Sequence, residues 1–236
     1  MWLALETSGD CASVAVGTAG RVFGEAELAG TRQHAAALPG LIDQALGQAG
    51  ARGAEVEGVV LADGPGSFTG LRIGATVAKG VLRAQPRAFW GVPSLVAMAA
   101  AAGGRADGSL IMAVGDALRG ELFAAAIRRH PGHLELILPP QAWRPDALAA
   151  DCPLPDLLVL RDGGTPVLPS AWTQVLRIVR APAARDLLAL IGVSGGARFI
   201  NDAAGWEPDY GRPAEAQARW EATHGRRLPD SPGLLR

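Results

Sequence analysis

The chain contains little cysteine and almost no lysine. Its 236 residues include two cysteines, Cys11 and Cys152, and a single lysine, Lys79. Two distant cysteines without Cys-x-x-Cys spacing argue against a disulfide framework and against a zinc site. Chemistry that requires a lysine side chain has one candidate, and no carboxylate lies near Lys79 in the sequence to act as its partner.

Neither sign of charge dominates, and long apolar runs are missing. The chain has 22 Lys and Arg against 23 Asp and Glu, which gives a formal net charge of -1 and argues against strong independent binding to nucleic acid. The longest apolar run, Leu95–Ala102, is too short to cross a membrane, and the N-terminus has no signal-peptide pattern. We therefore expect a cytoplasmic protein, whose hydrophobic content of 49% suffices for one large or two small domains.

Strand-like and helix-like segments alternate through the first hundred residues. The expected strands are Trp2–Glu6, Ala12–Gly17, Val22–Leu28, Val56–Ala62 and Ala88–Val92. The expected helices are Thr31–Ala49, Leu71–Ala84 and Ser94–Ala102. The glycine-rich segment Gly103–Gly108 then indicates a domain boundary.

The rest of the chain repeats this plan. Three strands are expected at Leu110–Gly115, Glu121–Arg128 and Leu134–Leu138, followed by short elements at Pro145–Ala150, Leu157–Leu160, Val175–Val179 and Ala184–Leu190. The repeat predicts an α/β protein with two similar lobes, the layout of the actin-like ATPase (ASKHA, ribonuclease H-like) fold. We expect an N-terminal lobe at 1–104, a reduced C-terminal lobe at 105–204, and an irregular tail at 205–236 with a short helix at Pro213–Thr223.

The most informative segment is a glycine-rich stretch between a buried strand and a helix. It reads Gly64-Pro65-Gly66-Ser67-Phe68-Thr69-Gly70-Leu71-Arg72-Ile73-Gly74. Such a turn aims several backbone N–H groups at one point, where the helix dipole also favours an anion. Its glycine spacing nevertheless fits neither a P-loop nor a dinucleotide fingerprint. Ser67 and Thr69 are suited to capping the helix.

Small residues recur along the helix that follows. Gly70, Gly74 and Ala78 are four residues apart, so they share one helical face, which lets another segment approach closely. Glycine inside a helix costs about 0.5–1 kcal/mol relative to alanine, so the packing that the close approach allows should offset this cost. From the residues alone, the approaching segment is either this protein's own sheet or a partner helix.

The glycine-rich string resembles the signature of the TsaB (YeaZ-like) family, the bacterial dimerisation subunits of the tRNA threonylcarbamoyladenosine (t6A37) biosynthesis complex. Other segments are similar in position and character, namely Leu3–Ser8 with Cys11–Val16, Arg32–His34 with Leu38-Pro39, Gly91–Leu95, and Asp116–Phe123. The resemblance implies the same two-lobed fold. It also implies a non-catalytic scaffold subunit that pairs with TsaD, the related threonylcarbamoyltransferase that modifies N6 of tRNA adenosine 37.

The resemblance further implies where partners bind. The pairing surface would be the glycine-rich loop and its helix, with the first helix beside them, and comprises Gly64, Pro65, Gly66, Ser67, Phe68, Thr69, Gly70, Leu71, Arg72, Gly74 and Ala78. Phe68 and Leu71 would be apolar anchors, and Arg72 a polar contact. The ATPase subunit TsaE would dock near the junction with ATP or ADP between, tRNA would be met only through the complex, and the free chain would pair with itself. No cofactor of its own and no metal are expected.

One departure concerns the tail. The family pattern Pro-x-Tyr-Leu-Arg is replaced here by Pro208-Asp209-Tyr210-Gly211-Arg212. Gly211 removes an apolar anchor, which argues against docking of the tail.

The alternative is an independent ATP-dependent phosphotransferase or hydrolase of the actin-like fold. In active members of the superfamily, the turn after the first strand carries an aspartate, followed by glycine and threonine or serine, that meets metal and phosphates. The matching residues here are Glu6, Thr7 and Ser8, and Asp116 occupies a comparable turn in the second lobe. If Glu6 and Asp116 held Mg-ATP across a cleft, the chain would be such an enzyme; otherwise Glu6, Thr7, Ser8 and Asp116 are a vestigial nucleotide site.

Two other motifs carry less weight. Gly192–Gly196 contains Ser194 in a Gly-x-Ser-x-Gly pattern, with Asp209 and His224 downstream as in an α/β-hydrolase, but a glycine-rich turn after a helix explains it more simply. His34 is isolated, and His130 and His133 flank a Pro-Gly turn, so the histidines predict no metal site.

Overall fold

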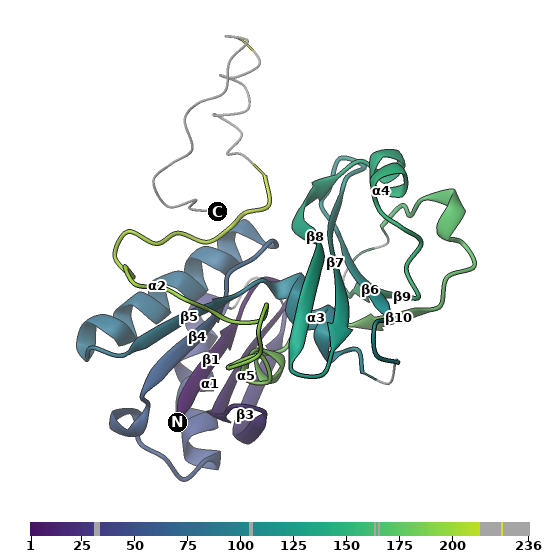
Figure 1. The fold of residues 1–236 in the computed structure, drawn as a ribbon. Helices are drawn as coiled ribbons and strands as arrows, with labels where there is room; N and C mark the ends of the chain where they lie inside the picture. The colour runs from purple at the N-terminus through teal and green to yellow at the C-terminus, as the bar shows by residue number, and fades with distance from the viewer. Residues whose placement is uncertain (31–33, 104–105, 163, 165, 213–222, 224–236) are drawn as a thin grey trace.

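The computed structural model describes residues 1–30, 34–103, 106–162, 164, 166–212 and 223 (Figure 1). Its strands are β1 (Trp2–Glu6), β2 (Cys11–Thr18), β3 (Arg21–Ala29), β4 (Gly58–Ala62), β5 (Ala88–Val92), β6 (Leu110–Asp116), β7 (Leu122–His130), β8 (His133–Trp143), β9 (Leu157–Arg161), β10 (Arg177–Arg180) and β11 (Arg198–Phe199). Its helices are α1 (His34–Gln48), α2 (Phe68–Ala84), α3 (Ser94–Ala101), α4 (Pro145–Asp151) and α5 (Ala184–Leu188), with 3-10 turns η1 (Gly53–Glu55) and η2 (Ser170–Trp172).

The described strands form two sheets that share a five-stranded order, to which the first sheet adds β11. The first sheet runs β11-β5-β4-β1-β2-β3, and the second runs β10-β9-β6-β7-β8. In each, a three-stranded antiparallel meander (β1 to β3, β6 to β8) is extended by two strands parallel to its first strand (β4 and β5, β9 and β10). The predicted α/β fold with two similar units is confirmed.

Burial explains which strands are central. All five residues of β4, Gly-Val-Val-Leu-Ala, are buried, as expected of a parallel strand covered on both faces. In β1, Leu3 and Leu5 join the outer cluster with side chains of α1 and α2, whereas Ala4 joins the cluster between the sheets. The period of two along the strand therefore separates two cores.

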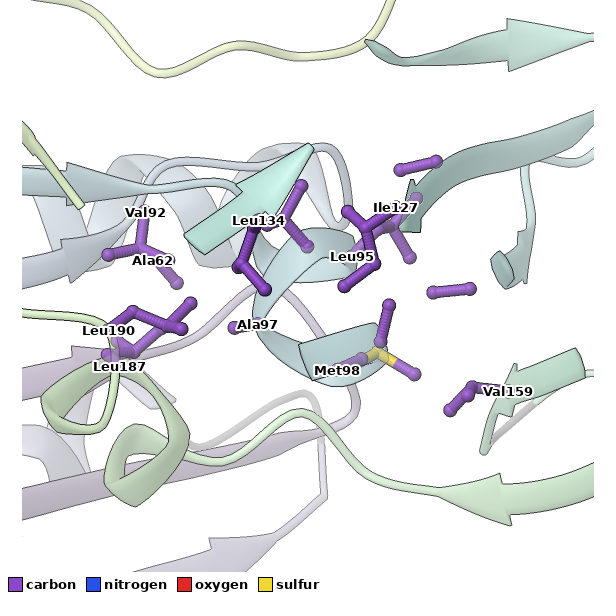
Figure 2. Close-up of a cluster of buried hydrophobic side chains, with 14 of the residues drawn as sticks. Ala62, Val92, Leu95, Ala97, Met98, Ile127, Leu134, Val159, Leu187 and Leu190 are labelled. Atoms are coloured by element: carbon purple, nitrogen blue, oxygen red, sulfur yellow. The ribbon is translucent and has the colours of Figure 1, made fainter. Parts of the chain in front are cut away.

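The core between the sheets joins the two units (Figure 2). Figure 2 shows Ala62 and Val92 of the first sheet, Leu95 and Met98 of α3, and Val159 of the second sheet in one apolar cluster. Leu187 of α5 belongs to the same cluster. The helix α3 thus lies between the two sheets, and a third cluster fills the outer face of the second sheet under α4 and η2.

The chain returns to the first sheet after β10. The helix α5 packs on β1 to β4, and β11 pairs antiparallel with β5. Both elements lie within the range 105–204 that the sequence suggests for the C-terminal lobe, and those domain limits stay a prediction. Residues 205–212 of the tail contain no helix or strand, and all of the helix expected at Pro213–Thr223 except Thr223 lies outside the described residues. None of the described helices is long and apolar enough to cross a membrane.

Candidate partner surface and inter-sheet cavity

The glycine-rich loop is held by hydrogen bonds to both sides. The Ser67 amide donates to the Ser8 carbonyl at 2.8 Å, and the Ser94 amide donates to the Gly64 carbonyl at 2.8 Å. Gly64 has φ +111°, a conformation that favours glycine, and the Gly64-Pro65 peptide is cis. The Ser67 hydroxyl accepts from the Gly70 amide at 3.2 Å, so Ser67 is the N-cap of α2 and its predicted capping role is confirmed.

The small residues of α2 face this protein's own sheet. Gly70, Gly74 and Ala78 are all buried. A Cβ atom on Gly70 would clash with the Thr7 carbonyl, and one on Gly74 would clash with the Thr7 hydroxyl and lie 3.1 Å from Leu61 Cδ1. The close approach that the glycines allow is therefore the seating of α2 on β1 and β4, and the interpretation of these three residues as a partner-facing stripe is corrected.

The outer side of α2 does present an exposed surface. Phe68, Thr69, Arg72 and Thr76 are exposed, and the Phe68 side chain retains 55% of its area. Gly80, at the next helical turn, has open space at the position of a Cβ atom. Leu71, expected as an apolar anchor, is 1% exposed and belongs to the core, so it cannot contact a partner directly. Of the predicted interface, Gly64 and Pro65 are also buried, and Gly66 and Ser67 are half-buried.

An aromatic and arginine cluster forms at the start of α2. The centres of the Phe68 and Tyr210 rings lie 4.7 Å apart, and the Arg72 guanidinium lies 5.4 Å from the Phe68 ring centre. Tyr210 reaches Phe68 from the tail. Exposed aromatic and arginine side chains of this kind are the ones enriched at protein interfaces.

A cavity of about 720 Å³ lies between the two sheets beside this cluster. Its walls come from the β1–β2 turn, the start of α2, the β6–β7 turn, the segment after β9 and the tail; they include Ser8, Gly9, Asp10, Gly66, Ser67, Phe68, Thr69, Asp116, Ala117, Leu118, Phe123, Arg161, Asp162, Gly164, Tyr210 and Arg212. Because β1 and β4 are parallel, as are β6 and β9, the cavity lies at the carboxyl ends of paired strands from both sheets.

The four residues of the expected vestigial nucleotide site are only partly brought together. Ser8 and Asp116 line the cavity, whereas Glu6 and Thr7 are fully buried and do not. The Glu6 carboxylate accepts from the Ser8 amide at 2.6 Å, and the Thr7 hydroxyl donates to the Gly70 carbonyl at 2.8 Å. Burial raises the pKa of Glu6, against the opposing effects of its hydrogen bonds to Ser8 and the charge of Arg161. Glu6 and Asp116 therefore do not face each other as a pair of metal ligands across the cavity.

Arg161, which the sequence analysis did not single out, ties the second sheet to the glycine-rich loop. It ends β9, is 8% exposed, and donates from Nη2 to the Pro65 carbonyl at 2.9 Å. A Cβ atom on Gly66 would lie 3.0 Å from its Nη1, so the glycine leaves room for the guanidinium. The contact joins residues 96 apart in sequence, and only its position at the end of a buried strand marks Arg161 in the sequence.

The tail segment 206–212 docks across both sheets (Figure 1). Trp206 is buried with its ring 5.1 Å from that of Phe89, the Asp209 amide donates to the Asp63 carbonyl at 2.7 Å, and the Ala142 amide donates to the Gly211 carbonyl at 2.9 Å. We call residues 206–212 the strap.

Gly211 is required by the strap's path. It has φ +71°, and a Cβ atom there would lie 2.5 Å from Pro65 Cβ and 2.8 Å from Phe123 Cε1. The expectation that Gly211 weakens docking is wrong, because the glycine permits the strap to pass close to the loop. The next residue, Arg212, donates to the Ala117 carbonyl and lies 5.3 Å from the Phe123 ring centre.

An ion pair between buried Asp63 and exposed Arg198 fixes the end of β4. Asp63 is 1% exposed, and its Oδ2 accepts from Arg198 Nη2 at 2.7 Å and Nε at 3.1 Å. Burial raises the pKa of Asp63 to about 6, although the charge of Arg198 lowers it. This pair joins β4 to β11 and was not visible in the sequence, because no motif accompanies either residue.

The described residues do not show the arrangement that a serine hydrolase or a metal site would need. Ser194 lies in the turn that follows α5 and pairs through its backbone with Gly132 and Leu134, so no strand precedes it. The Asp209 carboxylate accepts from the Gly211 amide at 2.8 Å, and His224 lies outside the described residues. No group of three or more His, Cys, Asp or Glu side chains suited to a metal ion occurs among the residues that the structure places.

Three comparisons relate the chain to known proteins. The family model described as "TsaD: tRNA N6-adenosine threonylcarbamoyltransferase" matches residues 27–156, a range that includes the glycine-rich loop and α2. The "tRNA threonylcarbamoyladenosine biosynthesis protein TsaB" of Bacillus subtilis (strain 168) is 32% identical over 178 residues, which cover 69% of this chain and 72% of that protein. The protein of the same name from Escherichia coli (strain K12) is 30% identical over 145 residues, covering 59% of this chain and 62% of that protein.

A solved structure shows the same fold over most of the chain. It is described as an uncharacterized protein with similarity to peptidase YEAZ from Pseudomonas aeruginosa, and it superposes with a TM-score of 0.72. The two chains are 26% identical, and the match covers 89% of this chain and 99% of that one.

Proposed function

The chain belongs to the TsaB (YeaZ-like) branch of the proteins that the TsaD family model describes, and from this premise we propose that it is a non-catalytic subunit of the machinery that forms threonylcarbamoyladenosine in tRNA. The observation that carries the proposal is the 32% identity over 178 residues to a protein named for this pathway. In this role the chain binds TsaD and holds it in one arrangement, as a ligand that favours one conformation of its partner.

The absence of a catalytic role is supported by the site. Glu6 is buried away from the cavity, and the Ser194 turn has no strand before it. Three of the cavity's charged side chains, Arg161, Arg212 and Asp116, are hydrogen-bonded to the chain's own backbone. These observations favour a scaffold over a phosphotransferase.

The surface proposed for TsaD is the exposed side of α2 with its aromatic and arginine cluster. Phe68, Thr69, Arg72 and Thr76 supply it, and the buried glycines beneath keep the helix close to the sheet. Phe68 is the apolar anchor and Arg72 the polar contact, whereas Leu71 supports the helix from below. The same surface allows the free chain to pair with itself.

Further partners follow from the same proposal. TsaE would dock near the junction of the two related chains, with ATP or ADP bound between the subunits, and tRNA would be contacted through the complex. The protein would act in the cytoplasm, without a metal or cofactor of its own.

The test is light-scattering gel filtration of the chain alone and mixed with TsaD of its own organism. Thr76→Arg and Gly80→Arg add bulk on the exposed side of α2, where Gly80 has open space for a side chain. Thr173→Arg is the matched control, because Thr173 is exposed beside η2 on the second sheet. We expect a complex with the wild type and the control, and at least about tenfold weaker binding with the two α2 variants.

The absence of any complex with the wild type would refute the proposal. Equal binding by all four proteins would refute the placement of the surface on α2, while leaving the scaffold role intact.

A further inference from the structure

The strap lies along the flank of α2 (Figure 1). At the first turn of the helix, the ring centres of Tyr210 and Phe68 are 4.7 Å apart. Further along the helix, Lys79 Nζ donates to the Ala204 carbonyl at 3.1 Å, just before the strap, and lies 3.8 Å from Glu207 Oε1 within it. Phe68 and Lys79 are about 16 Å apart along the axis, at about 1.5 Å per residue. The strap therefore borders α2 over three helical turns.

The other side of the strap is anchored independently of α2. The Trp206 ring packs on Phe89, the Asp209 amide donates to a carbonyl of the first sheet, and the Gly211 carbonyl accepts from an amide of the second sheet. These contacts place the strap before any partner binds. A partner that uses the strap therefore avoids most of the entropy cost of ordering it.

The contacts between the strap and α2 leave side chains available at the surface. Lys79 and Glu207 are 30% and 69% exposed, and an ion pair that is this exposed contributes little to stability. Phe68 stays 55% exposed although Tyr210 packs on it. Burial raises the pKa of Tyr210, the charge of Glu207 raises it further and that of Arg72 lowers it, so both charges lie near its hydroxyl. The result is an aromatic centre with a charged edge, which is the usual anatomy of a protein interface.

Gly211 sets the position of Tyr210. It has φ +71°, and a Cβ atom there would lie 2.5 Å from Pro65 Cβ and 2.8 Å from Phe123 Cε1. Any larger residue would push the strap away from the glycine-rich loop at this point. Tyr210 is the preceding residue, so its ring would then move away from Phe68.

We propose that the strap is the second half of the surface that binds TsaD, in which Tyr210 is an aromatic anchor beside Phe68 and Gly211 is the residue that positions it. This inference rests on the proposed function, because Phe68 and Arg72 belong to the surface assigned to TsaD there. A partner that lies along the exposed side of α2 meets the strap at two points, Tyr210 and Glu207. Such a surface suits a partner segment with an apolar centre and charged edges.

The experiment is isothermal titration calorimetry of the chain with TsaD of its own organism. Tyr210→Ala and Gly211→Ala should each bind at least about tenfold more weakly than the wild type, and Tyr210→Phe, which keeps the ring, should recover most of the affinity. Two matched controls should bind as the wild type does. Phe199→Ala removes another exposed aromatic side chain, whose ring centre lies 5.2 Å from that of Trp90. Gly20→Ala adds a methyl group at the same φ of +71°, where nothing lies within 4 Å.

Two single residues report on the strap directly. Tyr210 is the only tyrosine of the chain, so labelling with 3-fluorotyrosine gives a 19F signal from this position alone. The signal should shift when unlabelled TsaD is added. In free Gly211→Ala it should move towards the signal of the urea-unfolded chain, whereas in Gly20→Ala it should not. At the other end of the strap, acetylation of Lys79, the only lysine, should slow when TsaD is added.

Tyr210→Ala and Gly211→Ala variants that bind TsaD as tightly as the wild type would overturn this inference and leave the proposed function standing. A 19F signal that TsaD leaves unchanged would overturn the direct contact of Tyr210, and an unchanged signal in Gly211→Ala would overturn the positioning role of Gly211. No complex with the wild type would overturn the proposed function and this inference with it. A homodimer that Tyr210→Ala disrupts would in that case assign the surface to a second copy of the chain.

Discussion

Replacing Asp63 with asparagine tests how burial at the end of β4 links stability to pH. The Asp63 side chain is 2% exposed, and burial raises its pKa to about 6 from an ordinary value of 3.8. The folded state holds the Asp63 proton more tightly than the unfolded state does. The protonated carboxyl therefore adds to the free energy of unfolding fully below about pH 4, and this contribution is lost as the pH rises through about 6. The difference of about 2 pKa units corresponds to about 3 kcal/mol over the whole window.

The variant carries a neutral amide that does not titrate. Its oxygen can still accept from Arg198, so the local contact is kept in part. The free energy of unfolding of Asp63→Asn minus that of the wild type should therefore increase by roughly 1–1.5 kcal/mol between about pH 5 and about pH 7.5. Glu6 is also buried with a raised pKa, but it is present in both proteins, so its effect cancels in the difference.

The measurement is urea unfolding, followed by circular dichroism, at several pH values across this window. Asp151→Asn serves as the control, and its difference from the wild type should not vary with pH in this manner. A flat difference for Asp63→Asn would refute the reasoning. A difference of opposite sign would mean that attraction to Arg198 outweighs burial, so that the carboxylate is stabilised in its ionised form.

Three other predictions concern packing around α2. Gly74→Ala should destabilise the fold by about 1–3 kcal/mol, because the new methyl clashes with Thr7, whereas Gly80→Ala should be neutral or stabilise by up to about 1 kcal/mol; chemical denaturation compares the two. Leu71→Ala should cost about 2–5 kcal/mol in the same assay, because Leu71 is 1% exposed. Phe68→Ala should change stability by less than Leu71→Ala and weaken TsaD binding by more; the reverse ranking would contradict the division of α2 into a core side and a partner side.

The sequence predicted the fold well because the evidence for it was local. The period of two in the strands, the serine cap before α2 and the repeated meander each depend on residues close together in the chain. The sequence also indicated the loop that borders the cavity. It could not decide which side of α2 the small residues face, because a glycine stripe is equally suited to a neighbouring strand and to a partner helix.

The missed residues depend on contacts between distant parts of the chain. Arg161 meets Pro65 across 96 residues and Arg198 meets Asp63 across 135, and neither pair has a motif. Gly211 was misjudged for a related reason. The glycine removes an apolar contact only if there is room for a side chain at that position. The crowding by Pro65 and Phe123 becomes visible only once three separate segments are placed together.

The return of the chain to the first sheet has a consequence for synthesis on the ribosome. The first sheet receives its edge strand β11 and the helix α5 only after the whole second sheet has been made. An emerging chain with residues 1–102 outside the exit tunnel has one side of β5 unpaired and an inner face not yet covered by α5. The second sheet, by contrast, completes itself from one continuous stretch, Leu110–Arg180. During translation the second sheet should therefore be completed before the first. The unpaired edge of β5 is then the place where a nascent chain is most exposed to chaperones or to misassembly.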